Sequence, residues 1–182
     1  MNRRRVISFV SVIALTAVAG FTTPAAAQSA GSDQAGIVRT NLISSNPIGI
    51  IFEWFNGEFE HAIKSTVTLA VSGSHFSLGD ANYTAIDGIA RYYPSARAIR
   101  GFSIGGSVGA VKVSEDNCDG CTAFDESAFT IGIRGDHVWI LGRDQRFAVA
   151  AGIGAKRLFY SESDNEGTEG LPIGRLSIGY AW

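Results

Sequence analysis

The clearest pattern in the sequence is a repeated alternation of apolar residues with small or polar ones. Such alternation is typical of β-strands, because successive side chains of a strand point to opposite faces. In the C-terminal segment GRLSIGYAW, the apolar side chains share one face of the predicted strand: Leu176, Ile178, Tyr180 and Trp182. The pattern predicts eight strands, over residues 38–52, 55–63, 66–76, 83–93, 100–113, 128–139, 146–159 and 172–182. In the first of them, Pro47 cannot donate to a sheet ladder, so we expect a bulge or a break there.

The composition of the second face separates two kinds of β-protein. A soluble sandwich also alternates, but its solvent-facing side is rich in Lys, Glu, Gln and Thr. Here the second face is mostly Gly, Ala and Ser with isolated charges, as at Gly105, Ser107 and Gly109. Small residues with a few charges suit the crowded interior of a small closed barrel. We therefore predict an all-β fold, a closed antiparallel eight-stranded transmembrane β-barrel over residues 38–182.

The connections between the predicted strands alternate in length and charge. Those after the second, fourth and sixth strands are short and basic, with Lys64, Arg97, Arg100, Arg143 and Arg146. Those after the fifth and seventh strands are long and acidic. Short turns on one side and long loops on the other are typical of outer-membrane barrels, and an even number of strands places both termini on the short-turn side, the periplasm.

The N-terminal segment has the three parts of a secretory signal peptide. Arg3, Arg4 and Arg5 precede an apolar run over residues 6–19, and the small-residue site AAA ends at Ala27. The apolar run is shorter than the roughly 20 residues of a membrane-spanning helix. We predict a signal peptide over residues 1–27, a flexible N-terminal lead-in over residues 28–37, and export to the cell outer membrane.

Charge and composition exclude several other classes. The whole chain is 46% hydrophobic and 18% charged, which excludes a long disordered or polycationic tail. Cleavage after Ala27 would remove three of 15 basic residues and none of the 17 acidic ones, so the mature chain would carry a net charge of about −5. Nucleic acid is therefore not an expected partner.

The mature region resembles the small eight-stranded outer-membrane β-barrels of the OmpA and OmpW type. The C-terminal strand is similar to the assembly signal of that family, with Trp182 at the terminus, Tyr180 two residues before it and Arg175 seven before the end. Ser177 stands at the position where the family usually has glycine. The segment NGEFEHAI, residues 56–63, also looks like a strand of these families.

The resemblance implies a structural or interaction role in the outer membrane, with binding or passage of a small hydrophobic molecule as in OmpW-type relatives. It also implies outer-membrane lipids as surroundings and the barrel-assembly machinery as a transient partner that reads the terminal strand. A second interpretation of Trp182 is an aromatic ring at the membrane interface, where such rings are favoured. The two interpretations are compatible.

Charged residues on the polar faces are candidates for the barrel lumen. Glu58 and Glu60 share one strand face, as do Asp87 with Arg91 and Arg134 with Asp136, and Arg175 lies on the polar face of the last strand. Buried charges are tolerated only when paired, so we expect cross-strand ion pairs. These charges would form either a gate in a narrow polar pore or a lumen plugged by salt bridges, and the small size of an eight-stranded barrel favours the plug.

The remaining candidates for chemistry give weaker signals. Cys118 and Cys121 are too few for a structural zinc site and lack a thioredoxin-like setting, so a local disulfide is favoured over free thiols or metal. Three residues, Ser74, His75 and Ser77, are the nearest local match to a lipid-acyl-transferring Ser–His pair, but no acidic residue lies beside them to orient the histidine.

The second acidic loop also offers oxygen ligands: Asp164, Asn165, Glu166 and Glu169. Their spacing does not match an EF-hand loop, so solvated surface charge is favoured over calcium binding. We expect neither a cofactor nor an enzymatic activity. Two rival functions stay open: a soluble periplasmic β-barrel that binds a lipophilic ligand in its interior, and a lipid-modifying barrel enzyme.

The predicted disulfide can be tested on intact cells. Cys118 and Cys121 would lie in an extracellular loop, where a disulfide that closes so few residues constrains the loop and hardly affects the barrel. A membrane-impermeant thiol reagent should therefore label the two cysteines only after reduction. Labelling without a reductant would contradict the disulfide.

Overall fold

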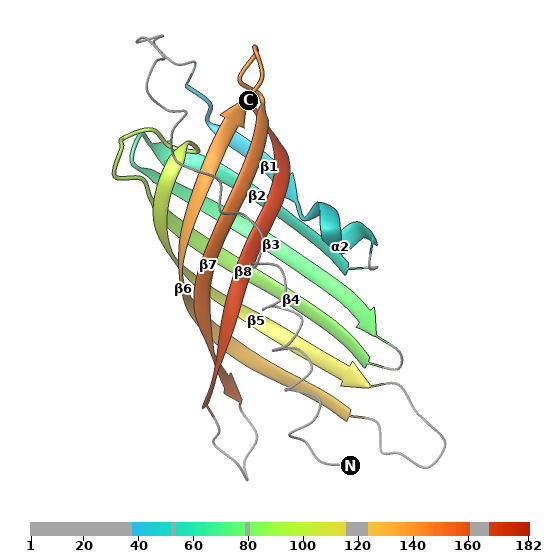
Figure 1. The fold of residues 1–182 in the computed structure, drawn as a ribbon. Coiled ribbons are helices and arrows are strands. Elements are labelled where there is room, and N and C mark those ends of the chain that lie inside the picture. The colour runs from blue at the N-terminus through green and yellow to red at the C-terminus, as the bar shows by residue number, and fades with distance from the viewer. Residues whose placement is uncertain (1–37, 52–53, 79–80, 116–123, 161–167) are drawn as a thin grey trace.

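The computed structural model describes residues 38–51, 54–78, 81–115, 124–160 and 168–182, which form a closed antiparallel barrel (Figure 1). Its strands are β1 (Asn41–Ser45), β2 (Trp54–Lys64), β3 (Val67–Leu78), β4 (Ala81–Tyr92), β5 (Gly101–Glu115), β6 (Phe124–Leu141), β7 (Phe147–Tyr160) and β8 (Thr168–Ala181). Each strand pairs with the next, and β1 pairs with β8 to close the ring. The predicted all-β, eight-stranded closed barrel is confirmed.

The predicted first strand is wrong in its extent. In place of one strand over residues 38–52, the structure has the five-residue β1 followed by a short helix, α2 (Pro47–Ile51). Asn46 caps this helix, because its Oδ1 accepts hydrogen bonds from the backbone N–H groups of Ile48 and Gly49 at 3.0 and 3.3 Å. Proline is favoured at the first helical position, since its missing N–H would have no partner there. Pro47 therefore ends the strand by starting a helix.

The other predicted strands are present with shifted ends. β6 begins at Phe124 instead of residue 128, because its ladder with β5 continues through pairs such as Ser114 with Asp125. Acidic residues interrupt the apolar alternation at this point, while backbone pairing does not depend on side-chain polarity. The acidic connection between β5 and β6 is consequently shorter than the sequence pattern indicated.

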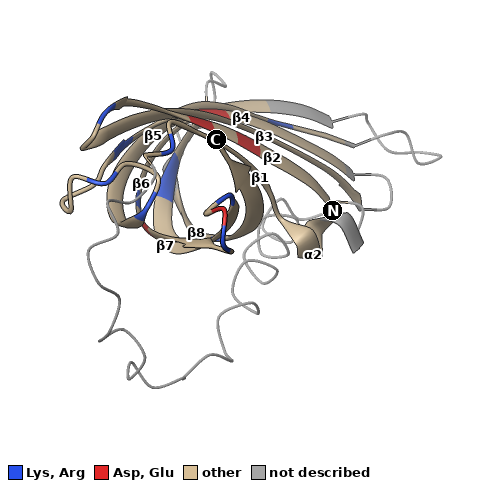
Figure 2. Cartoon of the chain, turned by 90° about the horizontal axis from the view of Figure 1, so that it is seen from above, with Lys and Arg blue, Asp and Glu red and all other residues tan. Residues whose placement is uncertain are grey.

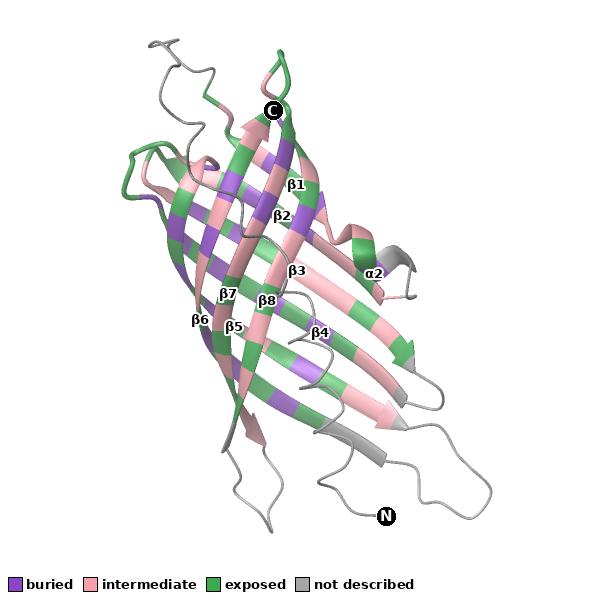
Figure 3. Ribbon diagram, in the orientation of Figure 1, coloured by how far each residue is buried: buried purple, intermediate pink, exposed green. Residues whose placement is uncertain are grey.

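The two faces of the barrel wall differ in burial and polarity, and burial alternates along the strands in Figure 3. Large apolar side chains on the outer face are exposed, among them Ile133 at 72% and Ile153 at 66%. The inner face carries mostly small, polar and charged residues together with a few buried apolar ones such as Leu42 and Ile89, and Glu60, Arg91 and Asp136 are buried there. None of the helices in the described ranges is long and apolar enough to cross a membrane.

The two ends of the barrel also differ. The end that carries the short β2–β3, β4–β5 and β6–β7 connections, which we call the turn end, also holds the start of β1 and the end of β8. Backbone hydrogen bonds join the start of β1 to the residue after β8, because the N–H groups of Thr40 and Asn41 both donate to the carbonyl of Trp182 at 3.0 Å. We call the opposite end the loop end. The predicted signal peptide and lead-in, residues 1–37, and the two cysteines lie outside the described residues.

A small apolar cluster fills the barrel interior at the turn end. Its buried members come from five parts of the chain: Leu42, Ile99, Val138, Ala148, Ala150 and Ala181. Ile99 has a φ of 64°, a conformation that β-branched residues rarely adopt. Its side chain is fully buried in the cluster, and this packing holds the backbone in its unfavourable conformation.

Candidate functional site

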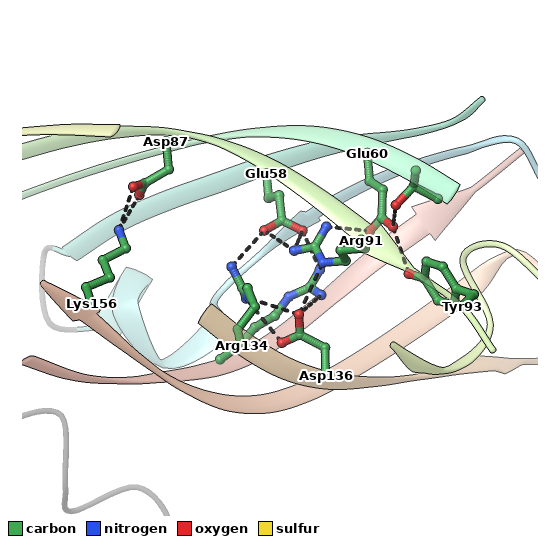
Figure 4. Close-up of polar contacts among 10 residues, drawn as sticks. Glu58, Glu60, Asp87, Arg91, Tyr93, Arg134, Asp136 and Lys156 are labelled. Atoms are coloured by element: carbon green, nitrogen blue, oxygen red, sulfur yellow. Dashed lines mark hydrogen bonds and ion pairs between the residues drawn. The ribbon is translucent and has the colours of Figure 1, made fainter. Parts of the chain in front are cut away.

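The candidate site is a network of ion pairs that crosses the middle of the barrel interior (Figure 4). At its centre, the guanidinium of Arg91 on β4 contacts three carboxylates. Nη2 lies 2.9 Å from Glu58 Oε2, Nη1 lies 2.9 Å from Glu60 Oε2, and Nε lies 3.1 Å from Asp136 Oδ2. The planar fork of a guanidinium can donate in several directions at once, which suits an arginine to this position better than a lysine.

Two further arginines complete the central part of the network. Arg134 Nε lies 2.8 Å from Asp136 Oδ2, and Arg175 Nη2 donates to Glu58 Oε1 at 2.5 Å. Glu58 and Asp136 are thus each shared between arginines. Three arginines balance three carboxylates in this group, so the buried site carries little net charge.

Glu60 links the network to the turn end through two hydroxyl groups. Its Oε1 accepts a hydrogen bond from Thr68 Oγ1 at 2.6 Å and another from the Tyr93 hydroxyl at 2.7 Å. All three residues are fully buried. Together with Arg91 they satisfy both oxygens of a carboxylate that has no access to water, which removes most of the cost of burying it.

A separate pair lies on the loop-end side of the central group. Lys156 Nζ on β7 donates to both carboxylate oxygens of Asp87 on β4 at 2.6 Å. The two side chains are about one-tenth exposed, more than those of Arg91 and Glu60. The interior is therefore apolar at the turn end and charged in the middle, and the apolar residues Ala85, Val111 and Ala128 are buried on the loop-end side of the Asp87–Lys156 pair.

Glycines on neighbouring strands make room for the large charged side chains. Asp87 is paired in register with Gly109, and Asp136 with Gly152. A Cβ on Gly109 would overlap the Asp87 carboxylate and the carbonyl oxygen of Ile86, and a Cβ on Gly152 would overlap the Asp136 carboxylate. The glycine-rich inner faces of β5 and β7 are thus the steric complement of the charges on β4 and β6.

The structure places all seven candidate lumen residues on the interior face: Glu58, Glu60, Asp87, Arg91, Arg134, Asp136 and Arg175. Asp87 and Arg91 share a strand face but belong to different contacts, because Asp87 pairs with Lys156. Sequence reasoning missed Lys156. Its position two residues after Gly154 on the same face of β7 was the signal that could have identified it.

The terminal-strand residues divide between the two faces. Arg175 points inward to the network. Tyr180 and Trp182 belong instead to a group of aromatic rings, in which the Trp182 centroid lies 6.0 Å from that of Tyr180 and 6.2 Å from that of Phe59. Arg146 donates to the Tyr180 hydroxyl at 2.5 Å. Arg175 therefore has a structural contact of its own, apart from any part in a recognition signal.

The residues considered for catalysis make other contacts. His75 Nδ1 lies 2.9 Å from Thr84 Oγ1, and Ser77 Oγ donates to Asn82 Oδ1 at 2.6 Å. Ser74 is adjacent to His75 in β3, so their side chains point to opposite faces of the wall. In the part of the chain that the structure describes, no three His, Cys, Asp or Glu residues gather in a way that could hold a metal ion. Three of the candidate calcium ligands, Asp164, Asn165 and Glu166, lie outside the described ranges.

Comparisons with known proteins bear on the fold. No protein-family model and no curated protein matches the sequence. The structure is similar to the crystal structure of the N-terminal β-barrel domain of Pseudomonas aeruginosa OprF, with a TM-score of 0.50 and 14% sequence identity. The similarity covers 80% of this chain and 98% of that domain. The resemblance to small eight-stranded OmpA-type barrels is thus confirmed at the level of the fold.

The central position of Arg91 can be tested by substitution. Arg91→Met leaves three buried carboxylates without their shared cation and should lower the free energy of unfolding by about 3–5 kcal/mol. Arg134→Met is the matched control, because Arg134 is less buried and its main partner Asp136 keeps Arg91. Urea unfolding of the refolded protein, followed by Trp fluorescence, should show the larger loss for Arg91→Met. Equal losses would contradict a network centred on Arg91.

The steric role of the glycines gives a second test. Gly109→Ala should destabilise the barrel by about 1–3 kcal/mol, because the new methyl group meets the Asp87 carboxylate and a backbone carbonyl. Gly88→Ala is the control on the neighbouring strand, where the closest atom to an added Cβ is 3.9 Å away. The same unfolding measurement compares the two variants. A neutral Gly109→Ala would show that the interior can expand at this level.

Proposed function

We propose that this chain is an integral outer-membrane β-barrel with a structural or interaction role, and that its lumen is closed by the Arg91 network. One observation carries the proposal. The barrel has an exposed apolar outer wall and a buried charged interior, which is the reverse of the arrangement in a soluble protein.

The outer wall supports a lipid environment. Exposed apolar side chains occur on every strand from β1 to β8, with Ile43 and Ile178 at one seam and Phe55, Ile86, Val108, Ile133 and Ile153 around the rest. A monomeric soluble protein rarely exposes a continuous apolar surface of this extent, because contact with water is unfavourable. A bilayer removes that contact, and a closed barrel leaves no unpaired sheet edge in the hydrocarbon.

The interior supports a structural role over transport. The side chains of Arg91, Glu60 and Asp136 are at most 1% exposed, and they bridge strands on opposite sides of the ring. Movement of a solute past them would require several buried ion pairs to break together. The expected binding or passage of a small hydrophobic molecule therefore finds no support in the centre of the lumen.

The same interior argues against the two rival functions. A soluble barrel that holds a lipophilic ligand needs an apolar cavity at its centre, whereas here charged side chains occupy that position. For a lipid-modifying enzyme, the Ser–His pair considered in the sequence does not form, because Ser77 donates to Asn82 and His75 contacts Thr84. We propose that the chain is not an enzyme.

The expected cellular setting follows from the sequence and the position of β8. We propose that the segment over residues 1–27 directs export, and that the barrel-assembly machinery is a transient partner. β8 supports this partnership, because it forms the closing seam with β1 and carries the aromatic residues Tyr180 and Trp182 at its end. Outer-membrane lipids would surround the apolar wall.

The location can be tested by fractionation combined with a variant. The protein should be recovered with outer membranes and should migrate differently on gels before and after boiling, because closed barrels resist unfolding by detergent. Ile133→Arg places a charge near the middle of β6 on the outer face, and it should destabilise a bilayer-embedded barrel by about 2–4 kcal/mol. Unfolding in lipid vesicles measures this loss.

The control variant is Ile133→Leu, which keeps an apolar side chain at the same position and should leave stability nearly unchanged. A soluble barrel would respond differently, since arginine at a position 72% exposed to water is tolerated. Recovery as a soluble periplasmic protein, with Ile133→Arg as stable as Ile133→Leu, would overturn the proposal.

A further inference from the structure

A hollow of about 400 Å³ lies at the turn end of the barrel, outside the Arg91 network. Its lining comes from the segment before β1, the β2–β3 turn, the β4–β5 connection and the β6–β7 turn. The apolar part of the lining includes Ala62, Ile99 and Ile140. At about 30 Å³ per water molecule, the space holds roughly a dozen waters, enough for a small organic phosphate group.

Four cationic residues line the same hollow: Arg39, Lys64, Arg97 and Arg100. Its lining includes no acidic residue within the described ranges. Figure 2 looks onto this end of the barrel and shows Lys and Arg in the turns around it, together with the acidic Asp144 of the β6–β7 turn, which does not line the hollow. The interior network has a different balance, because there four carboxylates pair with Arg91, Arg134, Lys156 and Arg175.

Two of the four cations are held in place without being neutralised. Arg39 Nη2 donates to the backbone carbonyl of Asp144 at 2.6 Å, and Arg100 Nη1 donates to Gln145 Oε1 at 3.4 Å. Both acceptors are uncharged amide groups, so the positive charges remain. Lys64 and Arg97 are exposed and form no ion pair with any residue that the structure describes. The hollow therefore presents a positive potential with partly fixed donors.

The backbone that lines the hollow adopts an uncommon conformation at three positions. Among the described residues, the non-glycine positions with positive φ are Ala96, Ile99 and Gln145, and all three line the hollow. Such conformations persist only where the surrounding structure determines them, and they concentrate at binding sites. The strained turns bring the cationic side chains of separate connections around one apolar floor.

We propose that this hollow binds the phosphate headgroup of an anionic phospholipid. The inference rests on the proposed function, because an embedded outer wall places the turn end at the level of a headgroup layer. An acyl-bearing ligand is favoured over a free anion since the lining continues into exposed apolar residues, with Ile63 54% and Val38 82% exposed. The cations bind the phosphate, and the acyl chains follow the outer wall.

The test uses the full mature protein refolded in an uncharged detergent and titrated with three soluble compounds. Dihexanoyl phosphatidylglycerol carries the proposed headgroup and acyl chains, dihexanoyl phosphatidylcholine is the zwitterionic counterpart, and glycerol phosphate lacks acyl chains. Calorimetric titration should show binding of the phosphatidylglycerol, and at least about tenfold weaker binding of the other two.

A pair of double variants assigns the binding to the hollow. Lys64→Gln with Arg97→Gln should weaken phosphatidylglycerol binding by about tenfold or more. Arg143→Gln with Arg146→Gln removes the same charge from residues of the β6–β7 turn that do not line the hollow, and it should change binding less than about twofold. Heat-modifiable migration checks that every variant is folded.

The other outcomes overturn the inference in distinct ways. Equal binding of phosphatidylcholine would remove the charge recognition, and equal binding of glycerol phosphate would identify a free-phosphate site. Equal loss in both double variants would show diffuse attraction to the basic turns. A folded, heat-modifiable barrel that binds no phosphatidylglycerol overturns this inference alone, whereas a protein that is soluble without detergent overturns the proposed function itself.

Discussion

The contacts of one guanidinium organise the interior of this barrel. Arg91 reaches from β4 to Glu58 and Glu60 on β2 and to Asp136 on β6, and Arg175 approaches Glu58 from β8. Because β2 and β6 lie on opposite sides of the ring, the network ties together walls that share no backbone hydrogen bonds. A buried charge is tolerated only with a well-placed partner. This requirement determines where the large side chains lie and, through them, where the wall needs glycine.

The rest of the architecture follows from a reversal of the polarity that is usual in soluble proteins, where apolar residues are inside and charged residues outside. Charged residues occupy the interior, and glycines such as Gly109 and Gly152 leave the volume that the carboxylates fill. Apolar residues cover the outer wall, where contact with lipid or another apolar partner would remove them from water. The two ends of the barrel also differ from each other. An apolar cluster with Ile99 closes the interior at the turn end, and cationic residues surround the hollow outside it.

Alternation along the chain was sufficient to predict the strands and their two faces because the geometry of a strand is local. The inner-face residues from Glu58 to Arg175 could be identified from parity alone, and the same rule would have identified Lys156 if it had been applied to β7. The prediction of the first strand was wrong for a local reason as well. The pair Asn46 and Pro47 is a helix-start signal, and the apolar residues after it were interpreted as a continuing strand. The shifted start of β6 has a different cause, since pairing with β5 continues past the point where apolar alternation stops.

The sequence by itself determined the approximate positions of the strands, the polarity of each face and the basic character of the turns, because each depends on residues close together in the chain. Only the tertiary structure decided which charges meet. Asp87 is four residues from Arg91 on the same face, yet it pairs with Lys156, 69 positions away along the chain. The closure of the ring and the register of its strands set these distances, and no local pattern encodes either one. The gathering of Arg39, Lys64, Arg97 and Arg100 around one hollow has the same origin, since these residues come from three separate segments that meet at one end of a closed sheet.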